Sequence, residues 1–233
     1  MNGTIAQLTL STLLRKWRGI LLALLPLTML GLSAFLAAVV GEADVAEGLL
    51  GGLNLTTVVP LVALIIGTGA ISTEVDDGSI GYLLTKPVKR GLIISTKYIV
   101  AICAALVFAA VPTAIAAIIL TGEFGAVATS YTIAAAIACV VYCALFLMVG
   151  VVSKQAVMIG LLYILLWEGL ICGIVEGARV LSVKYWATSI ASTTADTTLV
   201  ASIGVTTAAI LAVVTTLGAI WYAGHRLRSL TIA

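Results

Sequence analysis

Charged side chains are scarce in this sequence. Asp, Glu, Lys and Arg account for only 9% of the 233 residues, whereas 62% are hydrophobic. A soluble domain usually carries about 25% charged residues, because its surface has to be wetted. The shortage excludes an ordinary soluble domain, and the few charges fall between long apolar runs. We therefore expect lipid rather than water to surround most of the chain.

Three features of other protein classes are also missing. There is no G-x-x-x-x-G-K-[ST] phosphate loop, so the chain cannot bind ATP by that route. The four cysteines, Cys103, Cys139, Cys143 and Cys172, lie inside apolar runs, which favours small packing residues over a disulfide framework. The net charge of +2 is too small to indicate a nucleic-acid partner.

A metal site or a catalytic site is not indicated either. The single histidine, His225, stands beside two arginines without an acid or thiol ligand set, which favours a lipid-facing or solvated role. The run Asp76-Asp77-Gly78 lacks the spaced aspartates that acidic metal motifs of membrane transferases require. We therefore predict no catalytic residue, no metal and no cofactor bound by this chain.

Six apolar stretches are long enough to cross a bilayer, which takes about 20 helical residues. They are Gly19–Val40, Leu53–Ile71, Tyr98–Leu120, Tyr131–Val152, Ala156–Val175 and Val200–Tyr222. Pro60 and Pro112 fall inside two of them and predict kinks, since neighbouring helices can satisfy the freed carbonyls. No connecting loop approaches the roughly 50 residues of a separate domain. The sequence predicts an all-α membrane protein, with residues 1–233 forming a single transmembrane domain.

Lysine and arginine predict how these spans are oriented. Ten of them fall on one side of the membrane and only two, Arg179 and Lys184, on the other. The ten are Arg15, Lys16, Arg18, Lys86, Lys89, Arg90, Lys97, Lys154, Arg226 and Arg228. Because basic loops stay in the cytoplasm, we expect both termini to be cytoplasmic in a multi-pass protein of the plasma (cell) membrane.

Two extramembrane segments flank the bundle. Residues 1–18 contain an amphipathic stretch, Ile5–Arg18, whose basic residues reach for lipid phosphate. This pattern predicts an amino-terminal interfacial helix on the inner leaflet, with membrane lipid as its partner. The outer segment 176–199 carries Tyr185 and Trp186, aromatics suited to the headgroup level. It is longer than a simple connection, and its length allows it to re-enter the membrane before the sixth span.

The cytoplasmic loop of residues 72–97 has an ordered pattern. Acidic residues come first and basic residues last, with apolar residues at helical spacing between them. The apolar residues are Ile80, Leu83 and Leu84. Gly78 before them and Pro87 after them predict the limits of a short helix. An apolar face presented to the cytoplasm favours a docking surface, and the alternative is an ordinary loop whose basic residues only set the topology.

This loop resembles that of ABC-2-type permeases, the membrane subunits of ATP-driven exporters with a type V-like fold. Their loop between the second and third spans commonly reads Glu, Gly, a leucine-rich turn, Pro and Arg, followed by Lys at the next span. The matching residues here are Glu74, Gly78, Tyr82, Leu83, Leu84, Pro87, Arg90 and Lys97. A second resemblance lies in the fifth span, where an acidic residue after Trp recurs in a subset of these permeases.

The resemblance implies a dimer of permease subunits, identical or related, each docking one cytoplasmic ABC ATPase subunit. ATP and Mg²⁺ would bind to the partner ATPase, whose closure would drive substrate efflux. By position, the docking residues would be Glu74, Gly78, Gly81, Tyr82, Leu83, Leu84, Thr85, Pro87 and Arg90. The substrate stays open, because family members move many kinds of compound.

Glu168 is the only ionisable residue well inside a predicted span. A carboxylate in lipid is costly, so it should face the bundle interior. Three roles are open for this carboxylate. It contacts a substrate or proton in the transport pathway, it forms a hydrogen bond between helices, or it meets Arg179 or Lys184 from the outer segment. The first role supports an alternative function, a stand-alone secondary transporter coupled to an ion gradient through Glu168. A membrane enzyme is a third hypothesis, which lacks the cluster of catalytic polar residues it would need.

Overall fold

The computed structural model describes residues 16–39, 46–76, 90–193 and 203–229, and this part of the chain is helical without any strand. The long α-helices are α2 (Lys16–Val39), α4 (Val59–Asp76), α6 (Arg90–Ala105), α7 (Val111–Thr121), α8 (Ala126–Val152) and α12 (Val205–Ser229). The shorter ones are α9 (Ala156–Leu162), α10 (Cys172–Ile174) and α11 (Val183–Ala191). Three π-helices, η1 (Gly48–Val58), η2 (Leu106–Ala110) and η3 (Tyr163–Ile171), and one 3₁₀ helix, η4 (Glu176–Leu181), complete the described elements. The predicted all-α fold is confirmed.

Among the described residues, six helical segments are long and apolar enough to cross a membrane, as the sequence predicted. They are Gly19–Val39, Gly48–Ile71, Ile94–Thr121, Ala126–Val152, Ala156–Ile174 and Val205–Arg226. The second begins at Gly48 rather than Leu53, because η1 continues it backwards through a glycine-containing turn. The third begins at Ile94 rather than Tyr98, which brings the buried Lys97 into a span. The predicted interfacial helix falls almost wholly in residues 1–15, outside the described part of the chain.

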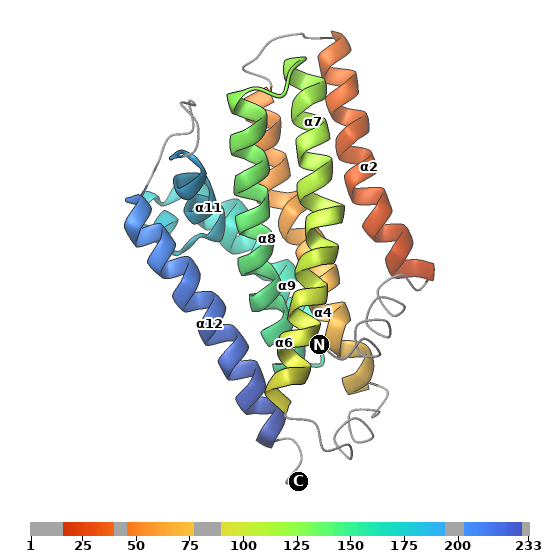
Figure 1. The fold of residues 1–233 in the computed structure, drawn as a ribbon, viewed down its shortest axis with the longest axis vertical. Helices are drawn as coiled ribbons and strands as arrows, with labels where there is room; N and C mark the ends of the chain where they lie inside the picture. Colours follow the sequence, from red (N-terminus) through yellow and green to blue (C-terminus); the bar gives the residue numbers. More distant parts are fainter. Residues whose placement is uncertain (1–15, 40–45, 77–89, 194–202, 230–233) are drawn as a thin grey trace.

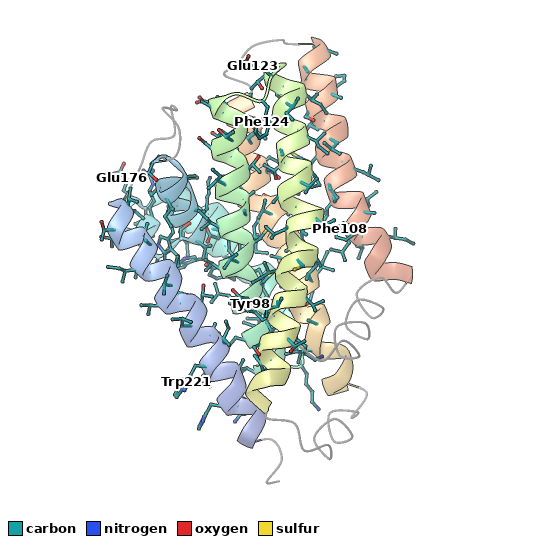
Figure 2. The ribbon with its side chains drawn as sticks, viewed as in Figure 1. Tyr98, Phe108, Glu123, Phe124, Glu176 and Trp221 are labelled. Carbon is teal, nitrogen blue, oxygen red and sulfur yellow. The ribbon has the colours of Figure 1, made fainter. Side chains whose placement is uncertain are left out.

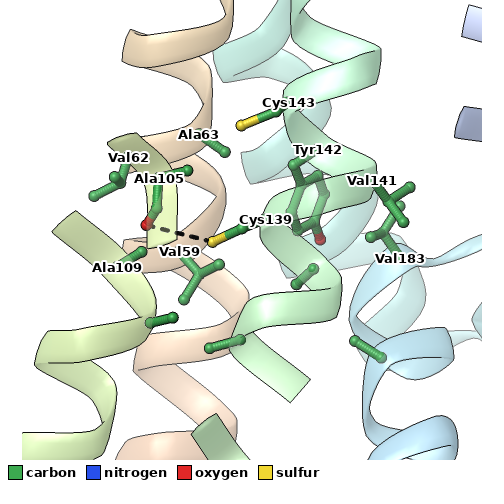
Figure 3. Close-up of a cluster of buried hydrophobic side chains, with 14 of the residues drawn as sticks. Val59, Val62, Ala63, Ala105, Ala109, Cys139, Val141, Tyr142, Cys143 and Val183 are labelled. Carbon is green, nitrogen blue, oxygen red and sulfur yellow. Dashed lines mark hydrogen bonds between the residues drawn. The ribbon is translucent and has the colours of Figure 1, made fainter. Parts of the chain in front are cut away.

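The fourth span, α8, lies at the centre of the bundle, with α4, α6, α7, α11 and α12 packed around it (Figure 1). Its buried face is rich in small residues such as Ala134, Ala138 and Cys139, which let neighbouring backbones approach closely. Figure 3 shows the resulting cluster, in which the Cys139 thiol faces the carbonyl of Ala105 at 3.7 Å. All four cysteines are free, consistent with packing roles.

Two of the π-helical stretches end just before a proline. η1 ends at Val58, ahead of Pro60, and η2 ends at Ala110, ahead of Pro112. Proline lacks the N–H that would bond four residues back, and its ring clashes with that carbonyl in an α-helix. The wider i→i+5 turn before each proline accommodates the freed carbonyl. The sequence predicted a kink at each proline, and the structure shows a π-helical stretch ahead of each one.

The described helices end at two opposite ends of the bundle. In Figure 1 the end of α4, the start of α6 and the end of α12 lie at the lower end of the bundle, and α2 starts at about mid-height. At the upper end α7 stops at Gly122, whose φ of 77° ends the helix in the left-handed region. Glu123 follows at that turn, and Figure 2 shows it at the end opposite the basic helix termini.

Candidate functional site

The predicted docking loop connects two helix ends that lie at the same end of the bundle. α4 ends at Asp76 and α6 begins at Arg90 (Figure 1). Seven of the predicted docking residues lie in the segment 77–89, outside the described residues: Gly78, Gly81, Tyr82, Leu83, Leu84, Thr85 and Pro87. Glu74 and Arg90 lie on the described helices, where only their backbone is described. The docking role of all nine residues therefore stays a prediction.

Lys97 joins the two helices that flank this loop. Its side chain is only 2% exposed, and its Nζ donates a hydrogen bond of 2.6 Å to the carbonyl oxygen of Ala70. A buried ammonium group is stable only when it is well hydrogen-bonded, so Ala70 has to stay within hydrogen-bonding distance of Lys97. It holds the first turns of α6 against the last turns of α4. The sequence identified Lys97 as part of a motif but not as a link between helices.

Glu168 lies on η3 in the fifth span and is 3% exposed. The Tyr163 hydroxyl donates to its Oε1 at 3.2 Å, and the backbone N–H of Val183 donates to the same oxygen at 3.0 Å. The Ser182 hydroxyl donates to Oε2 at 2.5 Å. The carboxylate therefore accepts one of the free N–H groups at the start of α11, where negative charge is also favoured by the helix dipole.

The π-helical form of η3 explains why Tyr163 reaches Glu168. The two residues are five apart in the sequence, and an i→i+5 helix brings such residues onto one face. An α-helix turns by about 100° per residue and would separate them. α-Helical spacing in the sequence therefore does not indicate this pair.

Three further side-chain contacts hold the segment that leads into α11. The indole N–H of Trp167 donates to the carbonyl of Leu181 at 3.3 Å, and that of Trp186 donates to Val180 at 2.6 Å. The thiol of Cys172 lies 3.6 Å from the carbonyl of Ala178. Together with Glu168, these contacts join the end of the fifth span and the outer segment into one hydrogen-bonded unit.

An aromatic chain links this unit to α8. The rings of Tyr142 and Phe146 stack with centroids 5.8 Å apart, and Phe146 meets Tyr163 edge-on at 6.3 Å. Aromatic pairs in these orientations stabilise a structure by more than the burial of their apolar area alone. Tyr163 thus contacts the central helix on one side and the Glu168 carboxylate on the other.

Arg179 and Lys184 gather around the ring of Tyr185. The guanidinium carbon of Arg179 and the Nζ of Lys184 lie 5.5 and 5.4 Å from the centre of its ring. Lys184 also donates a hydrogen bond of 2.7 Å to the hydroxyl of Thr56 on η1. Burial lowers the pKa of Lys184, and Arg179 lowers it further, while the Glu168 carboxylate opposes both. Among the described residues, the hydrogen-bond donors to Glu168 are a tyrosine, a serine and a backbone amide, so of the alternatives for this carboxylate the contact with Lys184 is electrostatic and not a hydrogen bond.

A model of the family described as ABC-2 family transporter protein matches residues 4–178, well over half of the chain. The chain belongs to the ABC-2 transporter family. The match includes the first five spans, the loop with the predicted docking residues, and Glu168. No curated protein matches the chain.

Membership in the ABC-2 family makes this chain the membrane component of an ABC transporter, a permease that is not itself the catalyst. The resemblance found in the loop sequence is therefore confirmed at the level of the family. The six apolar helices agree with a multi-pass membrane protein. Two buried side chains join separate helices of this permease. Lys97 joins α6 to α4, and Glu168 joins η3 to the start of α11.

Proposed function

We propose that this ABC-2 permease is the membrane subunit of an ATP-driven exporter and works as a dimer with two cytoplasmic ATPase subunits. The family match and the six spans support the proposal. The observation that carries it is the hydrogen bond from Lys97 to Ala70, which joins the two helices on either side of the predicted docking loop. A force applied to such a loop reaches two spans at once.

The charge distribution supports a cytoplasmic position for this loop. The start of α6 and the end of α12, both with basic residues, lie at the lower end of the bundle with the end of α4 (Figure 1), and Glu123 and Glu176 lie away from that end (Figure 2). Basic segments stay on the cytoplasmic side of the membrane. With this orientation both termini are cytoplasmic, and the apolar face of the loop meets the ATPase, which holds the ATP and Mg²⁺.

We also propose that η4 and α11 form a re-entrant outer segment. Ile190 of α11 and Ile137 of α8 line the same cavity, and Ile137 lies well inside the fourth span. α11 is therefore beside the spanning helices rather than above them. Its buried residues include Trp186 and Ala187, which pack inward as expected for a segment inside the bundle.

The ion-gradient alternative receives no support from the contacts of Glu168. Both carboxylate oxygens already accept hydrogen bonds from within the chain. A carboxylate that carries ions or protons across a membrane has to exchange its partners with the transport pathway. The arrangement favours the structural role that the sequence analysis had left open.

Co-purification with the candidate ATPase in detergent tests the proposal. Leu83→Asp combined with Leu84→Asp places two charges on the predicted docking face, whereas Leu83→Met with Leu84→Met keeps it apolar and serves as the matched control. We expect the ATPase to bind the wild type and the Met control, and to be lost from the Asp variant while the permease still elutes as a folded species. Equal ATPase binding by the Asp variant would contradict the docking role of the loop.

A further inference from the structure

α11 occupies the space between two long spans. An apolar cavity of about 360 Å³ lies between α8, α11 and α12. Its walls include Ile137 and Val141 from α8, Ile190 from α11, and Val213 and Leu217 from α12. α11 therefore forms one wall of this cavity and packs against both α8 and α12, which also contact each other directly. In Figure 1 it lies between these two helices in the upper part of the bundle.

α11 is too short to hold this position by its own stability. It has nine residues, and isolated helices below about 12 residues are marginal even in favourable sequences. Its first N–H groups also need acceptors, because no preceding turn supplies them. The N-cap residue Ser182 makes no capping bond to α11 with its own side chain. Instead, Glu168 from the fifth span accepts the N–H of Val183.

We propose that Glu168 is a positioning residue, whose carboxylate latches Ser182 and Val183 to the fifth span and thereby holds α11 between α8 and α12. The latch consists of one buried acceptor and three donors from two elements. Hydrogen bonds to a charged acceptor in a poorly polar interior are stronger than those between neutral groups. The inference is independent of the ATPase and of the direction of transport.

The latch predicts a specific response to conservative substitution. In Glu168→Gln the amide oxygen still accepts from Tyr163 and Val183, and the amide N–H₂ donates to the Ser182 hydroxyl, which is also an acceptor. The contacts therefore survive without the charge. Glu168→Ala removes all of them at once. A residue that works by exchanging protons would fail equally in both variants.

Cys172 is a natural reporter for the position of the outer segment. Its side chain is 0% exposed, and its thiol lies against the carbonyl of Ala178 on η4. If the segment moves away from the fifth span, this thiol becomes accessible. Cys139 and Cys143 are equally buried in α8, away from the segment, and act as internal references in the same molecule.

The experiment measures the reaction of each cysteine with a water-soluble maleimide in the purified full-length protein, resolved by mass spectrometry. Glu168→Ala should raise the rate at Cys172 by about tenfold, because local opening becomes easier once buried charge-assisted bonds are lost. Glu168→Gln should stay within about threefold of the wild type, because its bonds are retained. Glu176→Gln is the matched control, since Glu176 is exposed and contacts only Arg179 among the described side chains.

Three results would overturn the latch: an unchanged rate at Cys172 in Glu168→Ala, an equal rise at Cys139 and Cys143, or a Gln variant as reactive as the Ala variant. If Glu168→Ala does not fold, Ser182→Ala decides the question. It removes the hydroxyl that donates to Oε2 and that also contacts the Cys172 thiol, and it should raise the rate at Cys172 by about threefold without a rise at Cys139 or Cys143. No rise in Ser182→Ala would refute the proposal.

Discussion

Asn54 and Thr113 form a hydrogen bond of 2.8 Å inside the bundle, where each side chain is 1% exposed. Asn54 lies on η1, and Thr113 directly follows Pro112 at the start of α7. The Thr113 hydroxyl also donates to the carbonyl of Ala109 at 2.7 Å. The two spans that contain proline-linked π-helices are thus joined by a polar contact next to both distortions.

Thr113→Val should destabilise the protein by about 1–2 kcal/mol, because it keeps the shape of the residue but leaves the buried Asn54 amide without this acceptor. Thermal unfolding of the purified protein in detergent measures the effect. Thr216→Val on α12 is the matched control, since its hydroxyl donates only within its own helix, to Ala212. Equal stability of the two variants would show that the Asn54 contact adds nothing.

Gly67→Ala should cost about 1–3 kcal/mol of stability through overpacking. A Cβ at this position would stand 2.9 Å from the Cβ of Phe146 and 3.2 Å from the backbone nitrogen of Leu147, so α4 and α8 would have to separate. Gly218→Ala on α12 is the comparison, because nothing lies within 4 Å of its added Cβ. We expect a lower melting temperature for Gly67→Ala only. An unchanged melting temperature in Gly67→Ala would contradict the close contact of α4 with α8 at this glycine.

Lys97→Met should weaken ATPase binding by about tenfold, the equivalent of one hydrogen bond to a charged group. The substitution removes the contact with Ala70 that sets the spacing of α4 and α6, while its apolar chain keeps the buried volume. Co-purification with the ATPase, titrated in detergent, gives the affinity. Lys154→Met removes an exposed basic residue from the turn between α8 and α9 and should leave the affinity unchanged. A similar loss in both variants would indicate a general effect of charge.

Lys184 should make stability depend on pH in the alkaline range. Burial and Arg179 lower its pKa in the folded protein below its ordinary value. Between these two values the unfolded chain binds more protons than the folded one, so stability rises as the pH rises through that window. Melting temperatures measured from neutral to alkaline pH should show this rise in the wild type relative to Lys184→Met. Identical pH profiles would contradict it, and Lys154→Met provides the exposed-lysine control.

The sequence predicted the spans well because their signal is local. A segment that crosses lipid must be apolar over about 20 residues, and this requirement is visible without knowledge of neighbours. The prediction was less accurate at Lys97, since a charged residue ordinarily ends a span. Here the ammonium group is hydrogen-bonded to Ala70 of a different helix, so the third span extends past it.

The contacts of Glu168 could not be predicted in the same way. The sequence indicated that this carboxylate should face the interior, because exposure to lipid is costly. Its donors, however, include Ser182 and Val183 from beyond the end of the fifth span, and Tyr163 five residues earlier on a π-helix. Neither the turn of the outer segment nor the local change of helix type has a clear pattern in the sequence.

By itself, then, the sequence determined the number of spans, the membrane class and the family, because each depends on residue type and order along the chain. Only the tertiary structure decided that Glu168 caps α11 and that Lys97 joins α4 to α6. Both side chains are buried ionisable groups, and hydrogen-bond partners that make burial tolerable come from other segments of the folded chain. Those partners are brought together by packing around α8, which no single stretch of sequence specifies.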